Sequence, residues 1–156
     1  MRIAEVQGTS YRPINDAGTY LTLASSVAHT GDYWNSPVRG GAGGTRGPTA
    51  YFPPAFPYFL AGVDLLDGHA SKRGPAIHPA RLSQAVIGTI AVGLIGLVAL
   101  EAFGGTVALI ALAIAAAYPV LIELSGTLVA ENLLTVFILL AVWAALRARR
   151  ARRSFA

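Results

Sequence analysis

The chain has 156 residues, of which 54% are hydrophobic, 13% are charged and none is cysteine. This apolar composition is atypical of a soluble domain and favours a membrane protein. The lack of cysteine excludes disulfide frameworks, thiol nucleophiles and thiolate metal sites. The formal net charge is +4, but many of the basic residues form an arginine run beside an apolar stretch, which indicates membrane topology rather than nucleic-acid binding.

Residues 1–79 are rich in proline, glycine and polar side chains, and we expect them to form an extracytoplasmic loop. Residues 16–29 predict an amphipathic helix on the membrane surface, because apolar side chains recur about one turn apart. These side chains are Tyr20, Leu23, Ala24 and Val27. Residues 31–48 predict a glycine-rich loop, and residues 51–66 predict a second, aromatic surface helix behind Pro53-Pro54, with aromatic rings suited to lipid headgroups.

Residues 80–147 contain three stretches long enough to cross a bilayer as helices, at about 82–103, 106–124 and 128–146. We expect Gly104-Gly105 to form the first turn and Pro119 to kink the second span. Small residues, including Gly88, Gly93 and Gly96, allow close helix packing in lipid. The sequence therefore predicts an all-α integral membrane fold with three transmembrane helices after two surface helices.

The arginines after residue 146 set the predicted orientation. Basic residues flanking a span stay in the cytoplasm, so residues 148–156 form a basic cytoplasmic tail and residues 1–79 lie outside. The expected location is the plasma membrane, as a multi-pass protein. Because residues 1–24 lack a secretory signal, we expect either a helix upstream of this chain or translocation of the N-terminal segment by the following helix.

Asp16 and Glu131 are the carboxylates that we single out for chemistry. Asp16 begins the first predicted surface helix, where it could be an N-cap or a general base that takes a proton from an acceptor hydroxyl. Glu131 begins the third span, where it could be an interfacial residue. The alternative is that it faces a protein partner or a wet cavity, because a carboxylate at the membrane boundary is costly.

Other polar residues carry weaker signals. Glu101 is expected to be a solvated helix end, and the three histidines lack metal-ligand spacing, so we predict no metal site. Arg39 and Arg46 lie in the glycine-rich loop, where they could be solvated or could pair with a phosphate at the membrane surface. The loop lacks the Gly-Lys-Ser/Thr sequence of a nucleotide phosphate cradle.

Four segments in this order resemble glycosyltransferases that use polyprenyl-phosphate sugars. They read DAGTYLTLA, YFPPAFPYFLAGVDLL, ARLSQAVIGTIAVGLIGLVALEAFGG and YPVLIELSGTLVAENLLTVFILLAVWAALR. Such enzymes form the GT-C class of membrane transferases, which includes the protein O-mannosyltransferase (glycosyltransferase family 39) and aminoarabinose transferase types. The family often has two adjacent acids where this chain has Asp16-Ala17.

The resemblance implies transfer of a sugar from a polyprenyl phosphate to an acceptor hydroxyl at the outer face, with Asp16 as the catalytic residue. Glu131, Tyr20, Arg39 and Arg46 are the candidate substrate-binding residues. No cofactor is implied, and the expected partners are membrane lipid, the lipid-linked sugar, and either further helices of a longer enzyme or a partner membrane protein. The chain resembles the N-terminal part of such an enzyme, so we expect it to be inactive alone.

Two alternatives remain. A small non-catalytic membrane protein could scaffold or regulate a partner through its small-residue helix faces. A transporter fragment is less favoured, because an ion path needs an ionisable residue midway along a span, whereas Glu101 and Glu131 are expected at span ends.

Overall fold

A computed structural model describes residues 2–8, 11–35, 47–48, 52–67 and 76–154. In chain order, the elements are α1 (Arg2–Gly8), α2 (Asp16–Thr30), β1 (Trp34–Asn35), β2 (Gly47–Pro48), α3 (Ala55–Asp67), α4 (Ile77–Phe103), α5 (Gly105–Ala117), α6 (Pro119–Gly126) and α7 (Ala130–Ser154). The fold is α-helical, apart from one short β ladder.

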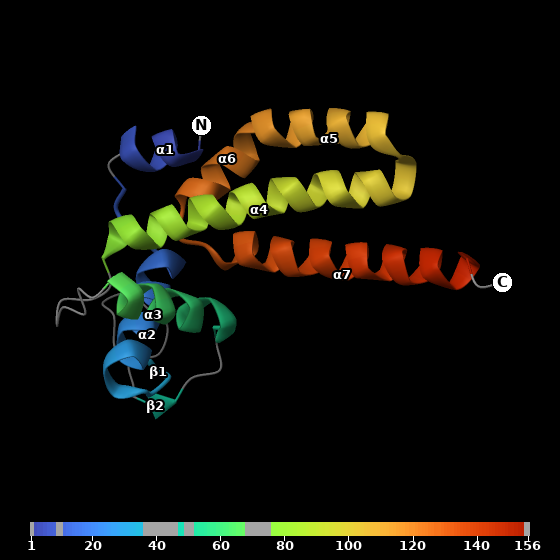
Figure 1. Ribbon diagram of the computed structural model, residues 1–156. Coiled ribbons are helices and arrows are strands. Elements are labelled where there is room, and N and C mark those ends of the chain that lie inside the picture. Colours follow the sequence, from blue (N-terminus) through green and yellow to red (C-terminus); the bar gives the residue numbers. More distant parts are fainter. Residues whose placement is uncertain (1, 9–10, 36–46, 49–51, 68–75, 155–156) are drawn as a thin grey trace.

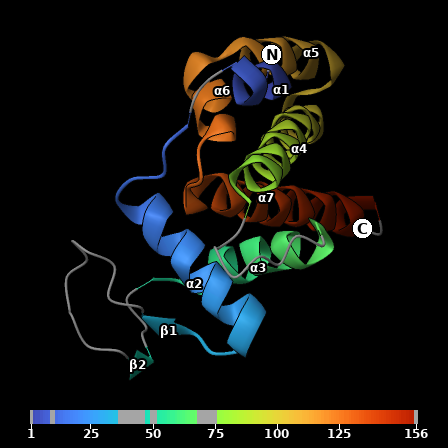
Figure 2. The same cartoon turned by 90° about the vertical axis from the view of Figure 1, so that its left-hand side faces the viewer.

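The long apolar helices form a layer with α4 in the middle. Figure 1 shows α5 and α6 along one side of α4 and α7 along the other, and the end-on view in Figure 2 confirms this order. Glycines permit the close approach between α4 and α5: a Cβ added at Gly96 would lie 2.9 Å from Cδ1 of Leu112. The expected packing role is thus confirmed for Gly96, whereas Gly93 faces open space.

The chain reverses between α4 and α5 at Gly104, whose φ of 92° is accessible to glycine at little cost. The return path is broken at Tyr118-Pro119, where α5 and α6 meet at a bend of 56°. Proline has no N–H to donate to the carbonyl of Ala115, four residues earlier. The expected kink is confirmed, and it is sharp enough to make two helices where the sequence suggested one.

Among the residues that the structure describes, two helical segments are long and apolar enough to cross a membrane, namely α4 and the Ala130–Ala151 part of α7. The bent α5–α6 pair is the third candidate if it counts as one span. Leu112 of α5 lies against Gly96, in the carboxyl-terminal part of α4. Gly126, the last residue of α6, accepts a hydrogen bond from Arg81, near the start of α4. The pair therefore returns along most of α4.

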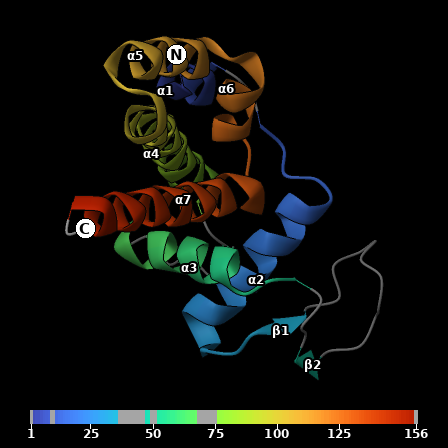
Figure 3. The same ribbon diagram turned by 90° about the vertical axis from the view of Figure 1, so that its right-hand side faces the viewer.

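Helices α2 and α3 pack together across one end of this layer, which we call the α2/α3 end (Figures 2 and 3). Their core joins both helices to the start of α4 and to the segment before α7. Its buried members are Ala17, Tyr20, Leu21, Ala24, Phe56, Leu60, Ala61, Ala80 and Leu128. The predicted apolar face of α2 is confirmed. Phe56 was expected in the headgroup layer, but it is 1% exposed and belongs to this core.

Two features differ from the sequence-based expectations. Helix α1 was not predicted, and it packs against α4 and α6. Within residues 31–48, a loop was expected, but β1 and β2 pair antiparallel with Trp34 opposite Pro48. Arg39 and Arg46 fall between these strands, outside the described residues.

Candidate functional site at the α2/α3 end

Asp16 is the first residue of α2, and its side chain is exposed. The N-cap is Asn15, with φ 52° and ψ −128° and no side-chain capping bond, so the capping interpretation of Asp16 is wrong. Within the described part of the chain, the Asp16 carboxylate has no hydrogen-bond or ion-pair partner. The carboxylate is therefore open to a ligand, and a negative charge is favoured in the first turn of a helix.

Glu131 occupies an equivalent position in the first turn of α7, and it is also exposed. The residues beside the two carboxylates, Ala17 and Ala130, contact the same apolar core. Two helices that are distant in sequence thus bring their amino-terminal turns, each with one carboxylate, to the same end of the molecule.

Tyr20 is a buried aromatic residue whose phenol is influenced by both carboxylates. Its ring is 8% exposed and makes edge-to-face contacts with Phe52 and Phe56, at centroid distances of 5.2 and 5.0 Å. Burial raises the pKa of the Tyr20 phenol, and the negative charges of Glu131 and Asp16 raise it further. Tyr20 and Ala17 belong to one core and Ala130 packs against it, so the structure brings three of the predicted site residues to the same end of the molecule.

Aromatic residues continue from Tyr20 towards the β ladder. The Tyr33 ring stacks on Tyr58 at 5.9 Å, and its hydroxyl donates to the carbonyl of Phe52 at 2.9 Å. Burial, followed by the neighbouring Tyr20 and Tyr58, raises the pKa of Tyr33. Aromatic faces with fixed hydroxyls suit a sugar ring, which offers both C–H and O–H groups.

The segment that leads to Glu131 is held by hydrogen bonds. The amide of Leu128 donates to the Tyr11 hydroxyl at 3.2 Å, and Gln84 Nε2 donates to the carbonyl of Val129 at 2.9 Å. Asn132 Nδ2 donates to Gln84 Oε1 at 2.9 Å. Sequence reasoning missed these residues, although polar amides inside apolar spans are a recognised signal of helix–helix hydrogen bonding.

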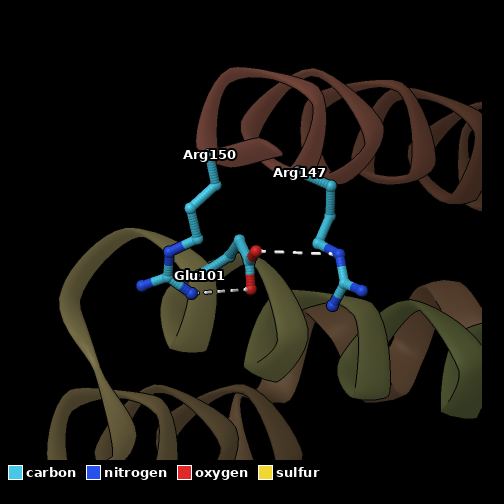
Figure 4. Close-up of polar contacts among 3 residues, drawn as sticks. All are labelled: Glu101, Arg147 and Arg150. Carbon is cyan, nitrogen blue, oxygen red and sulfur yellow. Dashed lines mark ion pairs between the residues drawn. The ribbon is translucent and has the colours of Figure 1, made fainter. Parts of the chain in front are cut away.

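Glu101 lies near the carboxyl end of α4, at the opposite end of the layer. Figure 4 shows its carboxylate between Arg147 and Arg150 of α7. Its side chain is 7% exposed, and its oxygens lie 3.8 Å from Arg147 Nε and 3.3 Å from Arg150 Nη1. Glu101 is therefore not a solvated helix end, because the α7 arginines cover it. These two ion pairs link α4 to α7 at the end of the layer opposite Tyr20.

Glu123 is a further carboxylate that sequence reasoning did not single out. It is exposed on α6, within the broken candidate span, and its side chain has no hydrogen-bond or ion-pair partner among the described residues. A carboxylate at such a position needs a polar environment, and irregular helices in membranes line protein or water rather than lipid. The described residues contain no group of three or more potential metal ligands among histidine, aspartate and glutamate.

A layer of long apolar helices, covered at one end by the shorter helices α2 and α3, defines an α-helical membrane protein. The family model for dolichyl-phosphate-mannose-protein mannosyltransferases matches residues 51–155, more than half of the chain. The chain belongs to this family, which confirms the resemblance. The matched part contains α3 to α7 and Glu131, whereas Asp16 and Tyr20 precede it. No curated protein and no solved structure matches the chain.

Proposed function

We propose that this chain is part of a membrane glycosyltransferase that moves a sugar from a polyprenyl-phosphate donor to an acceptor hydroxyl. The family supports a lipid-linked sugar donor in a membrane. The observation that carries the proposal is the position of Asp16, Glu131 and Tyr20 around one core at the same end of the apolar helices: Tyr20 lies in this core, and the neighbours of the two carboxylates, Ala17 and Ala130, pack in or against it. Further helices of a longer protein complete the site in this proposal, and the chain alone is inactive.

Asp16 acts as the general base. The acceptor oxygen attacks the anomeric carbon of the donor sugar, and its proton passes to the Asp16 carboxylate. The bond between the anomeric carbon and the phosphate oxygen breaks, and polyprenyl phosphate leaves with the electron pair. The exposed, unpaired carboxylate of Asp16 suits this role, because a base must reach the proton that it removes.

Glu131 and Tyr20 bind the substrate beside Asp16 in this proposal. Glu131 accepts hydrogen bonds from sugar hydroxyls, and Tyr20 contributes an aromatic edge and a phenol. Arg39 and Arg46 remain candidates for the donor phosphate, on the basis of their chemistry. The α2/α3 end faces the outside, because the arginines of α7 favour the cytoplasm.

Asp16→Asn tests the proposal in the full reading frame that contains this chain, expressed in membranes. We expect the variant to insert normally and to lose about 10²- to 10⁴-fold in release of polyprenyl phosphate from a radiolabelled donor, the usual range for loss of a general base. Asp32→Asn is the matched control, because Asp32 is exposed after the end of α2, and it should retain activity.

Retained transfer in Asp16→Asn would remove Asp16 from the mechanism. Absence of any transfer in the wild-type frame, with correct insertion, would instead favour the non-catalytic membrane scaffold.

A further inference from the structure

One face of α4 contacts the chain immediately before and after Glu131. Arg81, Gln84 and Gly88 are spaced by three and four residues and so lie along one side of the helix. Gln84 holds Val129 and Asn132. A Cβ added at Gly88 would overlap the Ser125 hydroxyl, which accepts a hydrogen bond from Arg2 Nε at 3.0 Å. This face therefore contacts α1, the end of α6 and the start of α7.

Arg81 is the charged member of this face. Its side chain is buried, with 5% of its surface exposed. Its Nε donates to the carbonyl of Gly126 at 2.7 Å, and its Nη1 donates to the carbonyl of Val6 at 3.1 Å. Its guanidinium carbon lies 4.8 Å from the centroid of the Tyr11 ring. A buried charge requires several such partners to offset its desolvation.

Both carbonyls that Arg81 binds lie in the last turns of short helices, Val6 in α1 and Gly126 in α6. Carbonyls there lack intrahelical partners and form the negative end of the helix dipole. Arg81 also stacks on Tyr11, whose hydroxyl accepts the Leu128 amide. Residues 126–129 are therefore held through Arg81, Tyr11 and Gln84 immediately before Glu131.

We propose that Arg81 is a positioning residue that fixes where the chain leaves α6, and thereby holds Glu131 beside α2. The catalytic consequence rests on the proposed function, but the positioning itself does not. Arg81 acts through residues 126–129 in this proposal.

Tyr20 provides a readout that requires no enzymatic activity. The chain is labelled with ¹³C-tyrosine in lipid nanodiscs, Tyr20 is assigned with Tyr20→Phe, and its phenol is titrated by NMR. Arg81→Ala should lower the Tyr20 pKa, because Glu131 moves away. Loss of a nearby positive charge alone would raise that pKa, so the two effects have opposite signs.

A double-variant comparison separates positioning from general loosening. Glu131→Gln alone should lower the Tyr20 pKa, and Arg81→Ala added to it should lower the pKa no further. Arg147→Ala, which removes one of the two arginine partners of the distant Glu101, is the control and should leave Tyr20 unchanged. An unchanged or raised Tyr20 pKa in Arg81→Ala, or a further decrease in the double variant, would overturn the proposal.

Tyr11→Phe is the second variant if Arg81→Ala does not fold. It keeps the ring beneath Arg81 but removes the acceptor of the Leu128 amide, so it should lower the Tyr20 pKa by a smaller amount. No change in Tyr11→Phe would then refute the positioning role. Loss of sugar transfer in Asp16→Asn tests the proposed function separately, since the Tyr20 readout does not depend on transfer.

Discussion

Tyr20 combines a packing role with a chemical one at the residue scale. Its ring lies in the core between α2 and α3, while the negative charges of two carboxylates on different helices act on its phenol. A phenol normally titrates near pH 10, and burial is the largest of the causes that raise its pKa here. The neutral form is therefore favoured in the folded protein.

The sign of this shift predicts a pH dependence. A raised pKa contributes stability that is present below about pH 10 and is lost as pH rises through the higher folded value. Removing either carboxylate should lower the Tyr20 pKa, and Glu131→Gln should lower it more than Asp16→Asn, because Glu131 is the larger electrostatic cause. Tyrosine NMR titration measures both variants, and the reverse order would contradict this arrangement of the site.

Some of these residues could be identified from the sequence and others could not. Tyr20 and Ala24 recur at a helical spacing, so the buried face of α2 was visible locally. The burial of Arg81 was not, because its acceptors, Val6 and Gly126, are supplied by distant parts of the chain. Glu101 was misread for the same reason, since its partners lie on α7.

At the element scale, the bend between α5 and α6 is stabilised by hydrogen bonds from another helix. Pro119 leaves the carbonyl of Ala115 without its usual donor, and Arg2 Nη2 donates to that oxygen at 3.4 Å. Arg2 also donates to Ser125 on α6, so α1 bridges the two sides of the break. A proline kink was predictable from sequence, but its compensation by an arginine from α1 was not.

Glycines on α4 give a matched test of this packing. Gly88→Ala should destabilise the chain by about 1–3 kcal/mol, the usual cost of inserting a group into a filled space, because its Cβ would overlap the Ser125 hydroxyl. Gly93→Ala should be neutral or slightly stabilising, since no atom lies within 4 Å of its added Cβ.

Thermal unfolding in one detergent would compare the two variants. Equal stability of Gly88→Ala and Gly93→Ala would mean that α6 does not lie against α4 as described.

For the whole molecule, the central question is how many times the chain crosses the membrane. In the described parts of the chain, two helices are each long enough to cross, and the bent pair makes a third crossing if it is one span. The expected three crossings require α5 and α6 to act as one span, and together they return from Gly96 to Arg81 along α4. That path covers about 22 Å of helix at 1.5 Å per residue, and the remaining turns near Phe103 extend it towards the bilayer thickness of about 30 Å.

The absence of native cysteine makes this count testable by labelling. An odd number of crossings places α2 and the end of α7 on opposite sides, so Thr30→Cys should react with an impermeant maleimide in intact cells and Ser154→Cys only after lysis. Labelling of both from the same side would indicate two crossings, with the bent pair as a re-entrant loop.

The bond between Arg2 and Ser125 joins residues 123 positions apart in the sequence, which has a consequence for assembly during synthesis. At about 5–20 residues per second, roughly 6 to 25 s separate the appearance of α1 from that of its partner on α6. During this interval α1 has no broken helix to bridge, and Arg81 lacks the Gly126 acceptor. Helix α1 is made before α4 and α6 but must dock after them, and the hydrogen bond from Arg81 to Gly126 forms only when α6 has been made.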